Sequence, residues 1–117
     1  MEFFEILKMN YFSYEGRLNR QPYIIRYLVM LAFMALGKML MTVSGSFGFN
    51  NIIASIILVA GTISILMLDV RRLHDLGRKW YWIFVMLVPL VNFAFILYLA
   101  IAEGEPGENE YGPSPLN

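Results

Sequence analysis

The residues best suited to chemistry lie in one short segment, residues 68–79, with the sequence LDVRRLHDLGRK. It holds four of the nine basic residues and the only histidine, His74. Arginines bind phosphates and carboxylates through paired hydrogen bonds, and an imidazole can carry a proton near neutral pH. Three roles follow: a structural ion-pair network, a site for an anionic ligand or partner, or proton transfer by His74 oriented by Asp69 or Asp75.

Helical spacing in this segment predicts particular ion pairs. Asp69 faces Arg72 at i+3. Arg71 likewise faces Asp75 at i+4. Exposed helical pairs contribute only about 0.2–0.5 kcal/mol each, so stability in water does not explain so dense a cluster. A structural or binding role is favoured over catalysis, because no nucleophile motif, phosphate loop or dinucleotide fingerprint accompanies the histidine.

The elements that position this segment are predicted to be membrane helices. The chain has 117 residues, 58% hydrophobic and 15% charged, which indicates lipid as the solvent. Three apolar runs, residues 23–43, 52–68 and 80–102, have about the length of a transmembrane helix. There is no cysteine and one histidine, so thiolate or multi-histidine metal sites are excluded and no cofactor is expected.

The two ends of the chain differ in character. Residues 1–22 predict an amphipathic helix in the membrane interface followed by a link, with a cap over the bundle as the alternative. Glu2 and Glu5 stand where a cleavable signal carries basic residues, so none is expected. Residues 103–117, rich in acids, prolines and glycines, predict a flexible tail that can dock through Tyr111.

Polar residues within the apolar runs leave alternatives open. Lys38 either snorkels to the outer interface or faces an acidic partner inside the bundle, and snorkelling is favoured. Pro89 and Asn92 either kink a single span over residues 80–102 or divide it into two half-helices that enter and leave on one side. The single span is favoured, because half-helices of that length are unusual.

Two further features bear on helix packing. Ala60, Gly61 and Ser64 form a small face that predicts close approach of a neighbouring helix, with a ligand groove as the alternative. The same small face leads us to expect a homo-oligomer. The second helix is expected to continue past residue 68 and to stop at Gly77.

The positions of the basic residues predict orientation. All nine precede Trp80, and the turn at residues 44–51 has none. The N-terminus and residues 69–79 are therefore predicted to be cytoplasmic and the turn external. The acidic tail is external if the third run crosses once and cytoplasmic if it re-enters.

Three segments together carry a family resemblance: residues 12–20 (FSYEGRLNR), 69–77 (DVRRLHDLG) and 107–113 (GENEYGP). In this order and spacing, the chain resembles the small bacterial inner-membrane proteins of domain-of-unknown-function family 805. The resemblance implies a helical protein of the bacterial inner membrane and supplies no activity, substrate or cofactor. Three places depart from the usual family pattern: Tyr23-Ile24, Lys79-Trp80 and Ser114.

The sequence thus predicts an all-α integral membrane protein of about three transmembrane helices plus the N-terminal amphipathic helix. The predicted function is a non-enzymatic membrane component whose cytoplasmic face binds anionic lipid headgroups or a partner protein. A small transporter or channel subunit, and a membrane enzyme using His74, are the alternatives. No nucleic-acid partner is expected. The predicted binding residues are Arg17, Arg20, Asp69, Arg71, Arg72, His74, Asp75 and Arg78.

Overall fold

The fold is all-α, as predicted. The computed structural model describes residues 2–43 and 48–115, and every regular element in these ranges is helical. The elements are α1 (Glu2–Tyr11), α2 (Arg20–Val43), α3 (Phe49–Asp75), the 3₁₀ helix η1 (Trp80–Leu87) and α4 (Val91–Ile101). The centre of the predicted turn, residues 44–47, lies outside the described residues.

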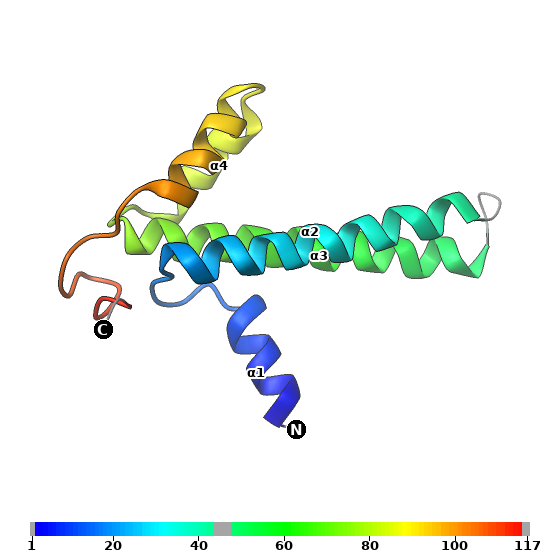
Figure 1. Cartoon of the computed structure of the whole chain (residues 1–117), viewed down its shortest axis with the longest axis horizontal. Helices are drawn as coiled ribbons and strands as arrows, with labels where there is room; N and C mark the ends of the chain where they lie inside the picture. The colour runs from blue at the N-terminus through cyan, green and yellow to red at the C-terminus, as the bar shows by residue number, and fades with distance from the viewer. Residues whose placement is uncertain (1, 44–47, 116–117) are drawn as a thin grey trace.

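Helices α2 and α3 lie side by side along the long axis of the molecule (Figure 1). Both are long and apolar enough to cross a membrane. A Cβ atom at Gly61 would collide with Met34, and one at Gly37 would come within 2.9 Å of Ile57. Small residues allow this close approach between membrane helices. The predicted packing role of Gly61 is confirmed, and Gly37 is its counterpart on α2.

Helix α3 continues past its apolar run and ends where the sequence predicts. Gly77 has φ of +77°, a left-handed conformation that glycine adopts without strain. The Arg78 amide donates to the Leu73 carbonyl at 2.8 Å and closes the last turn. The charged segment is therefore mostly helical, with its side chains held at fixed positions around the end of α3.

Helix α1 leaves the α2–α3 pair at a steep angle (Figure 1). The Ser64 hydroxyl donates to the Tyr11 carbonyl at 2.6 Å, which satisfies an orphan acceptor at the helix end. Phe3 and Phe4 on α1 are exposed. The predicted helix is present, and its location in the membrane interface stays a prediction.

The apolar run of residues 80–102 is divided into two helices. Pro89 lacks an amide hydrogen and disfavours a helical residue before it, and Val88 is extended, with ψ of 117°. Leu90 follows with φ of +70°. The chain reverses here, and η1 and α4 pack against each other (Figure 1). The prediction of one continuous helix over residues 80–102 is therefore wrong, because these residues form two half-helices. Entry and exit of the pair on one side of the membrane stays a prediction.

Neither half-helix has the length of a membrane span. The 8 residues of η1 extend about 16 Å, and the 11 residues of α4 extend about 17 Å. The hydrocarbon core of a bilayer is about 30 Å thick. Since η1 starts and α4 ends near the last turn of α3 (Figure 1), the pair has the form of a re-entrant hairpin.

Residues 103–115 fold back onto the end of α3, so the prediction of a flexible tail is corrected. The Glu105 amide donates to the Asp75 carbonyl at 2.7 Å. Asn109 and Gly112 exchange amide–carbonyl hydrogen bonds of 3.0 Å and close a tight turn. We call this end of the molecule, formed by residues 12–20, 68–79 and 99–115 together with Arg26, the charged end.

The hairpin form of residues 80–102 leads to a topology test. The chain has no cysteine, so single-cysteine variants can be labelled with a membrane-impermeant maleimide in vesicles of both orientations. We expect Ser13→Cys and Glu108→Cys to be labelled from one side and Phe49→Cys from the other. Leu90→Cys, at the hairpin tip, should be protected from both. If Glu108→Cys and Phe49→Cys are labelled from the same side, the re-entrant form is wrong.

Candidate functional site

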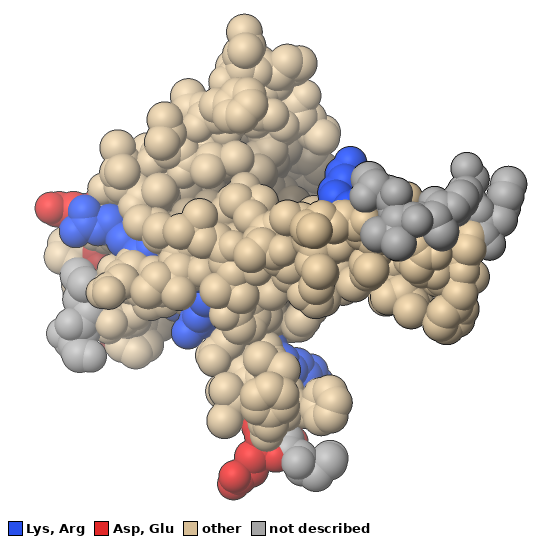
Figure 2. All heavy atoms as spheres, turned by 45° about the vertical axis from the view of Figure 1, so that its right-hand side comes forward, with Lys and Arg blue, Asp and Glu red and all other residues tan. Residues whose placement is uncertain are grey.

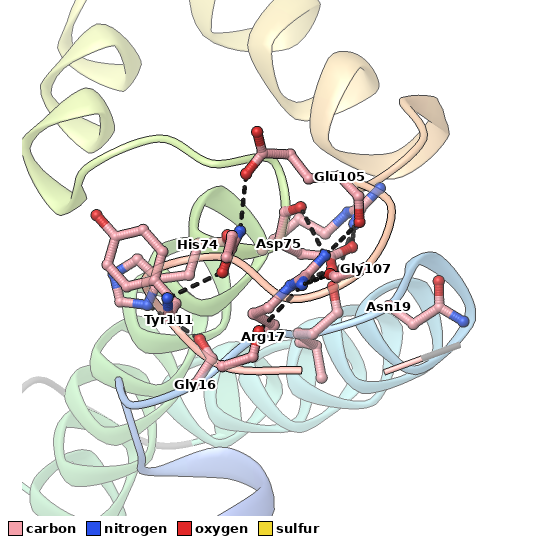
Figure 3. Close-up of polar contacts among 12 residues, drawn as sticks. Gly16, Arg17, Asn19, His74, Asp75, Glu105, Gly107 and Tyr111 are labelled. Carbon is pink, nitrogen blue, oxygen red and sulfur yellow. Dashed lines mark hydrogen bonds and ion pairs between the residues drawn. The ribbon is translucent and has the colours of Figure 1, made fainter. Parts of the chain in front are cut away.

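The centre of the charged end is a buried network in which Asp75 holds two arginines. Its carboxylate accepts hydrogen bonds from Arg17 Nε at 3.0 Å (Figure 3) and from Arg72 Nη1 at 2.5 Å. All three side chains are 3% exposed or less. One carboxylate compensates only one of two buried guanidinium charges, so other acceptors must satisfy the remaining donors.

Backbone carbonyls supply those acceptors around Arg72. Its Nε donates to Leu99 at 2.6 Å, its Nη1 donates to Leu18 at 3.1 Å, and its Nη2 donates to Ala102. Leu99 and Ala102 belong to the end of α4, where carbonyls lack helical partners and the helix dipole favours a cation. Arg72 therefore caps α4 and ties it to the link before α2.

Arg17 fixes the tail in the same way. It donates to the carbonyls of Glu105 at 2.5 Å and Gly107 at 2.6 Å (Figure 3). The tail passes very close to the network, because a Cβ atom at Gly104 would collide with the Asp75 carboxylate. These acceptors are main-chain atoms, so no side-chain pattern in the sequence identifies them.

His74 joins the link to the tail. Its Nδ1 lies 3.0 Å from the Gly16 carbonyl, and its ring stacks on Tyr111 with centroids 3.8 Å apart (Figure 3). A carbonyl only accepts, so Nδ1 carries the hydrogen. The predicted docking through Tyr111 is confirmed. The predicted orientation of the ring by Asp69 or Asp75 is wrong, because its hydrogen-bond partner is this carbonyl.

Asp69 lies apart from the network. Its Oδ1 accepts a hydrogen bond from the Tyr23 hydroxyl of α2 at 2.7 Å, and the side chain is fully buried. The predicted Asp69–Arg72 pair is therefore wrong, because Asp69 faces α2. The predicted Arg71–Asp75 pair is also wrong, because Arg72 and a residue from the link take both oxygens of Asp75.

Two predicted site residues contact η1 and α4 where this pair of helices meets the end of α3. Arg20 donates to the Ile101 carbonyl at 3.1 Å and adds a second cap to α4. Arg78 donates to the Tyr98 hydroxyl at 2.9 Å, and its guanidinium lies 4.5 Å from the ring centroid of Trp82. This is a cation–π contact between the end of α3 and the hairpin.

Arg26 and Arg71 converge on the last carbonyls of α1. Arg71 Nη1 donates to Met9 at 3.1 Å and to Asn10 at 3.5 Å, and Arg26 Nη1 donates to Asn10 at 3.4 Å. No carboxylate of the described residues forms an ion pair with either guanidinium. Sequence reasoning did not include Arg26 in the site, since an arginine near the start of an apolar span indicates only snorkelling.

The charged end thus separates into two parts. The network of Arg17, Arg72 and Asp75 is satisfied by protein groups and has little capacity for a ligand. The pair of Arg26 and Arg71 keeps uncompensated positive charge. Among residues 2–43 and 48–115, no three His, Asp or Glu side chains lie close enough to hold a metal ion.

Comparison with known proteins places the chain in a family. The model of a protein family of unknown function, DUF805, matches residues 11–113, from the end of α1 to the docked tail. The chain belongs to this family. It is 30% identical over 115 residues to the inner membrane protein YhaH of Escherichia coli K12, which is 97% of this chain and 94% of the relative. It is also 27% identical to the inner membrane protein YhaI of Escherichia coli K12. That match extends over 116 residues and covers 98% of this chain and 96% of the relative. No solved structure matches the chain significantly.

The segments that carry the family resemblance meet in the buried network. Arg17 comes from the first segment, Asp75 from the second and Gly107 from the third, and each contacts another of the three. With its two long apolar helices, this DUF805 chain is a helical membrane protein.

Removal of the shared carboxylate should destabilise the charged end. Asp75→Asn leaves two buried guanidiniums without a counter-charge, a change that costs about 3–5 kcal/mol in other proteins. We expect a lower midpoint of thermal unfolding in detergent and faster proteolysis of the tail. Glu110→Gln is the matched control, because its pair with Lys79 is 3.7 Å long and exposed. An unchanged midpoint for Asp75→Asn would contradict the structural role of the network.

Proposed function

We propose that this chain is a non-enzymatic component of the bacterial inner membrane whose charged end binds anionic lipid headgroups at the cytoplasmic face. The inner-membrane location is supported by the YhaH and YhaI relatives, which are inner membrane proteins by name. The cytoplasmic orientation is supported by the basic residues gathered at the charged end. Figure 2 shows basic side chains in separate patches across the visible face, beside a broad uncharged surface.

The observation that carries the proposal is the pair of Arg26 and Arg71. Both guanidiniums donate to the Asn10 carbonyl, so two positive charges meet at one acceptor. Arg71 Nε is buried and has no hydrogen-bond partner. A phosphate between the two guanidiniums would relieve their repulsion and accept hydrogen bonds from their unused N–H groups.

This proposal narrows the set of eight residues that the sequence indicates. Arg17 and Arg72 are buried and satisfied, and Arg78 lies between aromatic rings, so these arginines hold the fold together. Arg71 keeps its predicted binding role and gains Arg26 as its neighbour. Partner-protein binding and self-association stay predictions.

A transport pathway has less support from the polar residues of the helices. A pathway requires polar groups that face one another inside the membrane. Lys38 is exposed on α2, near the opposite end of that helix from the charged end, and Asn92 is in the first turn of α4. No interaction of the described residues brings the two together.

Replacement of both arginines should weaken lipid retention. Each basic residue near an anionic surface contributes about 1 kcal/mol, so Arg26→Gln with Arg71→Gln should lower retention of phosphatidylglycerol about thirty-fold. Native mass spectrometry of the purified protein, titrated with this lipid, measures the retained copies. The control is Lys38→Gln with Lys79→Gln, which removes the same charge elsewhere. Equal retention by the two double variants would exclude the arginine pair as the headgroup site. Arg72→Ala is a poor test, because it breaks the buried network.

A further inference from the structure

A second region beside α1 is hollowed, and neither Arg26 nor Arg71 lines it. Two hollows follow one another along the outer face of α3. A cavity of about 470 Å³ lies between α1, the link and Met67, and a groove of about 440 Å³ lies against Ile56, Val59 and Ile63. Ile63 and Met67 are four residues apart on α3, so the two hollows share one helix face.

Phe12 joins the two hollows, because its side chain lines both. It is 38% exposed and stands between them as a common wall. The cavity lies toward the charged end, and the groove runs from there toward the opposite end of α3. The polar cavity therefore precedes the apolar groove along α3. A phospholipid in a bilayer has the same order, from its polar headgroup to its acyl chains.

The two hollows differ in chemistry. The groove is lined by apolar side chains apart from Ser55. The cavity contains Glu5, Lys8 and Glu15. None of these charges forms an ion pair within the part of the chain that the structure describes. One cation and two carboxylates match a headgroup that carries both a phosphate and an ammonium, and they disfavour a purely anionic headgroup.

We infer that the cavity and groove bind one amine-bearing phospholipid. Its phosphate lies at Lys8, its ammonium lies between Glu5 and Glu15, and an acyl chain lies along the groove beneath Phe12. This site does not depend on the proposed arginine pair. It selects a zwitterionic lipid, whereas Arg26 and Arg71 would hold an anionic one.

The headgroup part is tested with two lipids of identical acyl chains, phosphatidylethanolamine and phosphatidylglycerol, titrated into the full-length protein and counted by native mass spectrometry. Wild type should retain phosphatidylethanolamine preferentially. Glu5→Gln with Glu15→Gln should lower that preference about five-fold, as expected for two exposed ion pairs. Glu2→Gln is the control, since Glu2 is an exposed acid of α1 outside the cavity. No preference in wild type, or a preference that survives the double change, overturns the headgroup assignment.

The groove part is tested by filling it. Ala60→Trp places an indole in the groove and should lower retention of both lipids about ten-fold, because the acyl chain loses its apolar contact. Leu31→Trp, on the exposed face of α2, should have no effect. If Ala60→Trp keeps its helicity and unfolding midpoint and retains as much lipid as wild type, the acyl chain does not lie in the groove. A dimer that forms in lipid-free detergent and is abolished by Ala60→Trp would assign the groove to a second copy instead. The glutamate variants test the site even if Ala60→Trp does not fold.

Discussion

The structure depends on the Asp75 carboxylate, which allows two guanidinium groups to lie buried at one end of the helical pair. Isolated charges of this kind are very unfavourable in an apolar interior. Asp75 compensates one charge, and the carbonyls that Arg17 and Arg72 collect satisfy the other donors. Those carbonyls belong to the link, the end of α4 and the tail. A single electrostatic requirement thereby joins segments that are 90 residues apart, as in the contact of Arg17 with Gly107.

The same requirement explains how a broken apolar run is held in place. A half-helix in lipid leaves terminal carbonyls without partners, and no water is present to satisfy them. At the end of α4 the acceptors Leu99, Ile101 and Ala102 all receive arginine donors. The cations also complement the negative end of the helix dipole. The arginines therefore fix the end of the hairpin that lies beside α3.

Local signals in the sequence predict the helices well and the site only in part. Hydrophobic runs indicate α2 and α3, and Gly77 marks the end of α3, because these features act within a few residues. The ion pairs depend on tertiary neighbours. Tyr23 reaches Asp69 from another helix, and Arg17 reaches Asp75 across 58 residues, so the i+3 and i+4 rules select wrong partners. The tail acceptors are carbonyl groups, which every residue type carries.

The three segments that carry the family resemblance lie at the buried network, and this location limits what they imply about function. These segments, residues 12–20, 69–77 and 107–113, meet in a network that protein groups already satisfy. They account for a shared fold and leave little room for a shared ligand there. Unsatisfied charge lies outside this network, at Arg71 in the second of these segments, at Arg26 in α2 and at Lys8 in α1. The binding properties of this chain should therefore be sought around α1, where Arg26 and Arg71 meet its last carbonyls and Lys8 lines the neighbouring cavity.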